Sequence, residues 1–186
     1  MGAGYALAPV GADHMMNIHD VSYVNKGRWL ERLNSALNEP VGPVPRAELK
    51  NEAKLKIFAN DVNFRHALDS VLICHFYPYD YAQVAQALSG VTGVAYTIRD
   101  VLDIGARAQT LSRLFNLREG FTAADDRLPA RVMRAFDEGP IAGEGISSED
   151  LTWFTQGFYA AMGWDAETGQ PTDACLQELG LAALIE

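Results

Sequence analysis

Cysteine is scarce in this chain, and its scarcity excludes several classes of protein. The 186 residues contain two cysteines, Cys74 and Cys175, which lie far apart in the sequence. Two thiols are too few for a disulfide-stapled secreted scaffold, and their sparing use suits a reducing cytoplasm. They are also too few to hold an iron–sulfur cluster or a structural zinc ion without help. We therefore expect a cytoplasmic protein that completes no such metal site alone.

Basic side chains and long apolar runs are also scarce. Lys and Arg total 15 against 24 Asp and Glu, which gives a net charge of −9 and a pI near 4.9. Phosphate recognition needs clustered cations, so we expect neither nucleic acid nor an anionic membrane as the main partner. No apolar run approaches the ~18 residues that span a bilayer. The first basic residue is Lys26, so we expect no signal peptide.

The residues that are present describe a globular protein. The composition is 48% hydrophobic and 21% charged, which is too apolar for a disordered chain. A chain of this length can bury a core without staples, and it corresponds to one domain or two small ones. We find no internal repeat and no low-complexity tract.

Hydrophobic periodicity predicts an all-α fold, an irregular multi-helix arrangement. Residues 1–46 are rich in Gly and Pro and weakly patterned, so we expect a loop-rich segment there and a helical body over 47–186. Thr97 with Asp100, and Ser147, are predicted helix N-caps. The predicted helices cover 47–76, 79–88, 96–117, a short stretch to about 137, 151–162 and a last one opened by Pro171.

Four stretches occur in an order that is informative. They are the GADH sequence at 11–14, which follows a GYA sequence at 4–6; DSVLIC at 69–74; residues 113–131; and residues 163–181. Together they resemble the C-terminal region of the aldehyde ferredoxin oxidoreductase family. Members of that family carry tungsten, sometimes molybdenum, on two pterin dithiolenes beside a [4Fe–4S] cluster. The resemblance covers nearly the whole chain.

The resemblance also implies that part of the family's protein is missing here. The N-terminal part, which holds most pterin contacts and three clustered cysteines, has no counterpart in the sequence. We therefore expect either a fragment or one piece of a split enzyme, incomplete and inactive alone. The sequence opens inside a motif, which favours a fragment. Residues 1–46 would then face the cofactor.

The family's pattern of an Asp five residues before a Cys falls on Asp69 and Cys74. The resemblance implies that Cys74 is the fourth ligand of the cluster and that Asp69 accepts hydrogen bonds from pterin N–H groups. Ile73 would contribute a backbone group. Without the resemblance, Cys74 would be interpreted as a buried structural cysteine and Asp69 as an N-cap or a partner of Arg65. On one ideal helix Asp69 and Cys74 would lie about 140° apart, so we expect the helix to end or loosen between them.

The family also uses a histidine in the region of the GADH sequence. We assign proton transfer to His14 on this basis, with His19 as the rival. Either histidine is otherwise a surface loop residue. Tyr5 is equally a hydrogen-bond donor to substrate or a core aromatic residue, and His66 is expected on a solvated helix face.

Two further features are predicted to be architectural. Residues 113–129 carry charges of both signs, and we expect Arg118, Glu119, Asp125, Asp126 and Arg127 to form a salt-bridged corner between a helix and a loop. Cys175 is expected in the core, because its neighbours on a terminal helix are apolar.

The resemblance implies an enzyme that converts an aldehyde and water to a carboxylic acid and passes two electrons through the cluster to ferredoxin. Its partners would be ferredoxin, the missing N-terminal part and an aldehyde substrate, with a homo-oligomer also possible. One alternative is an aryl-CoA reductase subunit of the same family. Another is a helical interaction module that has lost its cofactors.

Overall fold

A computed structural model describes residues 1–17, 19–46 and 48–184, and the regular secondary structure in these residues is helical. No strand forms among them, although two isolated bridges join Phe136 to Ala142 and Trp164 to Pro171. The predicted all-α fold is thus confirmed. The helices are α1 (Gly2–Leu7), α2 (Arg28–Asn34), α3 (Glu52–Ser70), α4 (Tyr81–Thr92), α5 (Ile98–Arg118), α6 (Ala130–Met133), α7 (Ser148–Ala161) and α8 (Asp173–Glu178), with 3-10 turns η1 (Asp20–Ser22), η2 (Ala123–Asp125) and η3 (Ala182–Leu184).

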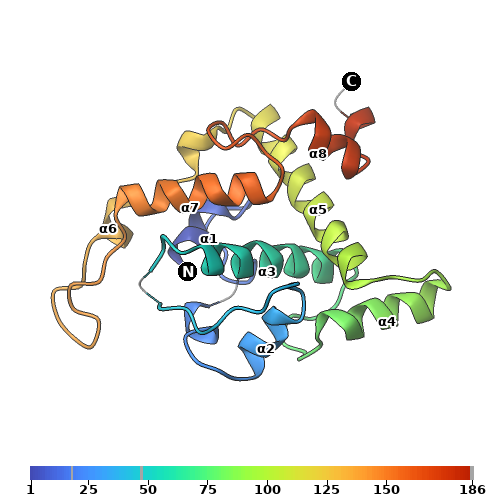
Figure 1. The fold of residues 1–186 in the computed structure, drawn as a ribbon. Coiled ribbons are helices and arrows are strands. Elements are labelled where there is room, and N and C mark those ends of the chain that lie inside the picture. The colour runs from blue at the N-terminus through green and yellow to red at the C-terminus, as the bar shows by residue number, and fades with distance from the viewer. Residues whose placement is uncertain (18, 47, 185–186) are drawn as a thin grey trace.

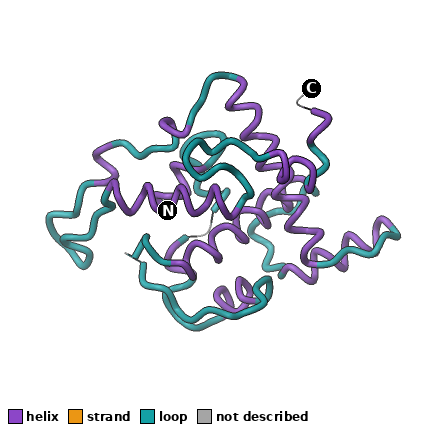
Figure 2. Tube along the Cα trace, turned by 45° about the horizontal axis from the view of Figure 1, so that its top comes forward, coloured by secondary structure: helices purple, strands orange, loops and turns teal. Residues whose placement is uncertain are grey.

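Helix α3 lies at the centre of the molecule, and the other long helices pack around it (Figure 1). Helix α7 runs above α3 in that view and α2 lies below it, while α5 crosses the end of α3 and carries α4 on its far side. Figure 2 shows that long loops connect these helices, above all between α1 and α3 and between α6 and α7. Within the described ranges no helix combines the length and apolarity needed to cross a bilayer.

Three apolar clusters share α3. The largest joins α1, α3 and α7, and in it the ring of Phe58 meets Phe154 and Phe158 edge-on, with centroids 5.0 and 5.5 Å apart. A second cluster joins α3, α4 and α5 around Phe64 and Tyr81, which are fully buried. The third packs α2 and the loop before α3 onto Ile57. Because α3 contributes residues to all three clusters, its packing positions the other helices.

The predicted caps are present. Thr97 accepts a hydrogen bond from Asp100 N, and Asp100 reaches back to Thr97 N, which makes a capping box at the start of α5. The side chain of Ser147 accepts from Asp150 N at the start of α7. These two helices begin within three residues of their predicted positions.

The beginning of the chain and the extent of α3 differ from the prediction. Residues 1–46 are not only loop, because α1 and α2 form there. The predicted boundary at Ala47 lies outside the described residues. Helix α3 begins after Asn51, whose side chain caps Lys54 N, and ends at Ser70 rather than near 76. The early end of α3 shapes the candidate site.

Candidate functional site

The turn that ends α3 carries the predicted cofactor residues. Ile73 N donates to Leu68 O at 2.8 Å and Leu72 N donates to Asp69 O at 3.1 Å, the pair of bonds that defines a Schellman motif. This motif needs a left-handed residue, and Leu72 adopts φ 59° where glycine is usual. The expected end of the helix between Asp69 and Cys74 is therefore confirmed. Asp69 stays on the last turn of α3, and Cys74 follows in the loop.

Cys74 and Asp69 are both accessible. The Cys74 side chain is exposed, so the interpretation as a buried structural cysteine is wrong. The Asp69 side chain is 51% exposed, and Arg65 pairs with Asp61 instead, at 2.6 Å between Nε and Oδ2. The alternative of an Asp69–Arg65 pair is thus also wrong. Ile73 is half-buried, and its N–H is used in the cap, so a backbone contact to a ligand would have to come from its carbonyl oxygen.

His75 is a neighbour of Asp69 that the sequence did not reveal. Its side chain is 7% exposed, and Nε2 lies 2.8 Å from Asp69 Oδ1. The approach is out of line for a hydrogen bond, and neither ring nitrogen has a hydrogen-bond partner among the described residues. The two groups form an ion pair only when the imidazole is protonated.

The loop of the two candidate histidines is tied to α3. His14 and His19 are both exposed, with ring centroids 6.2 Å apart in an edge-to-face arrangement. Arg65 Nη1 donates to Met15 O at 2.8 Å, next to His14. Arg65 lies one turn before Asp69, on the same face of α3. The fold therefore brings the GADH loop to the helix that carries Asp69.

His66 is not on a solvated face, contrary to expectation. It is 7% exposed, and its Nδ1 lies 2.9 Å from Val62 O, to which it donates. Burial lowers its pKa from the ordinary value of 6.5. The prediction was wrong because α3 is central and packs on several sides, which leaves no solvated stripe at this position. Cys175, by contrast, is in the core as expected, 6% exposed, and its thiol contacts Met162 O.

The stretch at 113–129 forms a buried polar network rather than the predicted corner. Arg113 donates to Gly169 O at 2.9 Å, to Asp126 Oδ2 at 2.7 Å and to Tyr159 OH at 3.3 Å, and Tyr159 OH donates to Asp126. Burial raises the pKa values of Asp126 and Tyr159. Among the described residues, Arg118 forms a salt bridge with Glu119 only, and Asp126 forms one with Arg113. The network joins α5, the residue that follows η2, and α7, through partners other than those predicted.

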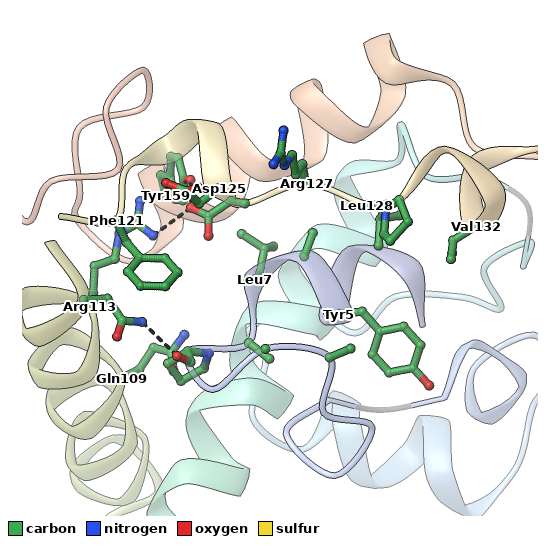
Figure 3. Close-up of a pocket in the computed structure, with 18 of the residues that line it drawn as sticks. Tyr5, Leu7, Gln109, Arg113, Phe121, Asp125, Arg127, Leu128, Val132 and Tyr159 are labelled. Carbon is green, nitrogen blue, oxygen red and sulfur yellow. Dashed lines mark hydrogen bonds and ion pairs between the residues drawn. The ribbon is translucent and has the colours of Figure 1, made fainter. Parts of the chain in front are cut away.

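A cavity of about 450 Å³ lies beside this network (Figure 3). Tyr5 and Leu7 from α1, Gln109 and Arg113 from α5, and Phe121 from the loop before η2 are among its lining residues. Tyr5 is half-buried at the cavity, so it is neither free at the surface nor sealed in the core. Neither His14 nor His19 lines this space.

The residues at the end of α3 could supply some of the ligands of a metal cofactor site, but not all of them. Cys74 offers one accessible thiol and Asp69 one accessible carboxylate. Across the described part of the chain, no group of three or more His, Cys, Asp or Glu side chains is placed to hold a metal ion. A [4Fe–4S] cluster takes four thiolates, so Cys74 would be one ligand among four.

Comparison with known proteins places the chain in a family. Residues 1–181 match the family described as "Aldehyde ferredoxin oxidoreductase, domains 2 & 3". The tungsten-containing aldehyde ferredoxin oxidoreductase of Pyrococcus furiosus is 30% identical over 139 residues, which is 71% of this chain and 22% of that protein. The enzyme of the same name from Pyrococcus abyssi is 28% identical over 142 residues, again 22% of its length.

A solved structure shares the fold. The active-site complex BamBC of benzoyl coenzyme A reductase, in complex with 1,5-dienoyl-CoA, superposes with a TM-score of 0.57 at 21% identity, covering 78% of this chain and 22% of that chain. The family match and these relatives define the class of protein, and the solved structure shares its fold. The chain belongs to the aldehyde ferredoxin oxidoreductase family and spans about a fifth of the length of the relatives it matches.

Proposed function

We propose that this chain is the C-terminal, cofactor-covering part of a tungstopterin iron–sulfur enzyme that oxidises aldehydes to carboxylic acids. The balanced reaction takes RCHO and water to RCOOH, two protons and two electrons, and the electrons pass through the cluster to ferredoxin. The observation that carries the proposal is the turn after α3. It exposes the Cys74 thiol five residues after Asp69, at the positions of the family motif.

In this proposal Cys74 is the fourth cluster ligand. A thiolate is the ligand that cluster iron takes, and the position in a loop lets the thiol reach a partner outside the helix. The other three cysteines would come from the part of the protein that precedes this region in the family.

Asp69 would hold the pterin, and Ile73 would add its backbone carbonyl. An ionised carboxylate accepts hydrogen bonds and makes charge-assisted ones, so it suits ring N–H donors. His75 contacts Oδ1 of Asp69 from a nearly buried position and would limit the rotation of that carboxylate. The bound tungstopterin would supply the two-electron redox chemistry.

His14 would move the proton that aldehyde oxidation releases. Its imidazole is exposed on a loop, where a side chain can reach a substrate. The hydrogen bond from Arg65 to Met15 O holds this loop against α3, one turn from Asp69. His19 stays the rival, because the two rings lie within 6.2 Å of each other.

The assignment of the cysteines is tested in the protein assembled with its cluster-binding part. Cys74→Ser is expected to deplete iron and to abolish electron transfer, because serine offers no thiolate. Cys175→Ser is the matched control and should retain iron, because Cys175 lies in the core against Met162. Iron analysis and reduction of ferredoxin measure both. Equal losses in the two variants would contradict the assignment.

The roles of His14 and Asp69 separate into rate and cofactor content. His14→Asn is expected to keep tungsten, pterin and iron while kcat falls by roughly 10²–10⁴-fold, the contribution of a positioned acid or base. Asp69→Ala is expected to lose pterin and tungsten. His19→Asn is the control. A rate loss with metal retained in His19→Asn but not in His14→Asn would move the role to His19.

An aryl-CoA reductase subunit is the second candidate, favoured by the shared fold with the benzoyl coenzyme A reductase complex. Turnover of an aldehyde against turnover of an aryl-CoA thioester distinguishes the two. A cofactor-free helical module is the third reading. Metal analysis that finds neither tungsten nor iron in the assembled protein would favour it.

A further inference from the structure

The loop that follows α3 exposes several large apolar side chains around Cys74. Leu72 is 93% exposed and Phe76 is 85% exposed. Each is two residues from Cys74, so their Cα atoms lie at most about 7 Å from that of the cysteine. Tyr77 and Tyr79 continue this surface, with exposed rings that stack 5.7 Å apart. We call these four side chains and Cys74 the Cys74 patch. Such clusters of exposed apolar side chains mark interaction sites.

The segment that carries the Cys74 patch is also poor in charge. Asp80 is the single Asp, Glu, Lys or Arg between Asp69 and Arg99, whereas 21% of the whole chain is charged. Asp80 itself caps α4, where its carboxylate accepts a hydrogen bond from Gln83 N. Depletion of charge together with enrichment in aromatic side chains is typical of the buried centre of protein–protein interfaces. The composition therefore indicates a protein partner.

The backbone at Leu72 gives a second, independent indication. Leu72 adopts φ 59°, a conformation that suits glycine, and its side chain gains almost no burial in this chain. Strained residues of this kind cluster at functional positions. A partner that covered the Leu72 side chain would offset the strain, because burial of an exposed leucine is favourable.

The thiol within the Cys74 patch indicates which partner covers it. A [4Fe–4S] cluster takes four thiolates, and in the proposed function Cys74 supplies one of them. A second copy of this chain would add one accessible thiol, because Cys175 is buried, and two thiols do not complete a cluster. A part that carries three cysteines would complete it. The chain spans about a fifth of the length of its relatives, so most of such an enzyme lies outside this region.

We propose that the Cys74 patch is the docking surface for the cluster-bearing part of the enzyme, and that contacts of Leu72 and Phe76 hold that part in place before iron is bound. The identity of the partner rests on the proposed function. The inference adds that docking does not need the metal, because apolar side chains carry it rather than iron–sulfur bonds. Docking then brings the Cys74 thiol to the other three cysteines.

Leu72→Gly separates docking from folding, because the two are expected to change in opposite directions. Glycine relieves the left-handed backbone and should make the chain more resistant to urea. It also removes the side chain, so the Kd for the iron-free cluster-bearing part, purified separately, should rise roughly 10–100-fold, the value of burying one leucine. A variant that is more stable and yet binds more weakly cannot owe its weaker binding to unfolding.

Two further variants locate the surface. Phe76→Ala should weaken docking by about tenfold or more, as expected for a central aromatic anchor. Phe136→Ala is the matched control, because its ring is 57% exposed on the loop between α6 and α7, across the molecule from α4 (Figure 1). It should leave the Kd unchanged. In the iron-free assembly, Cys74 should resist an alkylating reagent that modifies it in the chain alone.

The outcomes distinguish this proposal from the proposed function. Unchanged Kd values for Leu72→Gly and Phe76→Ala would overturn the docking surface, even if Cys74→Ser depletes iron. Weaker docking in both variants, with iron retained in Cys74→Ser, would support the docking surface and overturn the ligand role of Cys74. Self-association of the chain alone that Phe76→Ala abolishes would assign the Cys74 patch to a second copy and overturn the proposal.

Discussion

His66 is a residue whose burial sets a pH dependence for the whole chain. Its pKa is lowered from 6.5 because burial disfavours the charged imidazole. Below about pH 6.5 this residue is protonated in the unfolded chain but stays neutral in the folded chain. The free energy of unfolding therefore falls as pH drops below about 6.5, until the folded pKa is reached, with a slope of up to about 1.4 kcal/mol per pH unit.

His66→Gln is expected to remove this slope, because glutamine carries no titrating group and can still donate to Val62 O. Urea unfolding at a series of pH values from 7.5 to about 5 measures it. His19→Gln is the control, since that side chain is exposed. If parent and His66→Gln lose stability in parallel over this range, the buried imidazole is not the cause.

At the residue scale, the sequence indicates local features and misses distant ones. The motif over 69–74 is contiguous in the sequence. Its residues, and the end of the helix between Asp69 and Cys74, could therefore be predicted. The Arg113 network was not, because Tyr159 lies 46 residues from Arg113 and Gly169 lies 56 residues away. Nothing in the sequence marks Gln109, because only its surroundings in the fold leave its Oε1 without a hydrogen-bond partner among the described residues. The roles of His14, Asp69, Ile73 and Cys74 stay predictions.

The C-terminal end of α3 holds a leucine where the backbone favours glycine. Leu72 has φ 59°, which for an L-residue costs roughly 1–2 kcal/mol, and its side chain is 93% exposed, so little burial offsets that cost. Leu72→Gly is therefore expected to raise the free energy of unfolding by about 1 kcal/mol, less the added freedom of glycine in the unfolded chain. Urea unfolding of the 186-residue chain measures this.

Val71→Gly is the matched control for the same turn. Val71 has φ −104° and a half-buried side chain, so Val71→Gly gains no relief and should lose stability through both the entropy of glycine and the lost burial of valine. A Leu72→Gly variant as unstable as Val71→Gly would show that the left-handed conformation at Leu72 stores no strain.

At the element scale, prediction succeeded where caps and long periodicity agree. Helices α5 and α7 are 21 and 14 residues long, and their N-caps at Thr97 and Ser147 fixed their starts. Helices α1 and α2 were not predicted, because they have six and seven residues and no side-chain cap. Such short helices form through tertiary packing, here against α7 and α3, rather than through local preference.

The arrangement of the whole molecule depends on the close crossing of α3 and α5. A Cβ placed on Gly105 of α5 would lie 1.6 Å from Asn63 O and 2.5 Å from Asn63 C, both backbone atoms of α3. Backbone cannot yield as a flexible side chain can, so these helices approach this closely only with glycine at the contact. Helix α5 in turn carries α4 and the Arg113 network, so the crossing sets where the cavity lies.

Gly105→Ala is therefore expected to lower the free energy of unfolding by about 3 kcal/mol or more, the upper range of overpacking costs. Gly90→Ala in α4 is the matched control: no atom lies within 4 Å of its added Cβ, and alanine in an exposed helix position should stabilise by roughly 0.5–1 kcal/mol. Thermal and urea unfolding measure both. A Gly105→Ala chain as stable as its parent would mean that α3 and α5 do not meet as described.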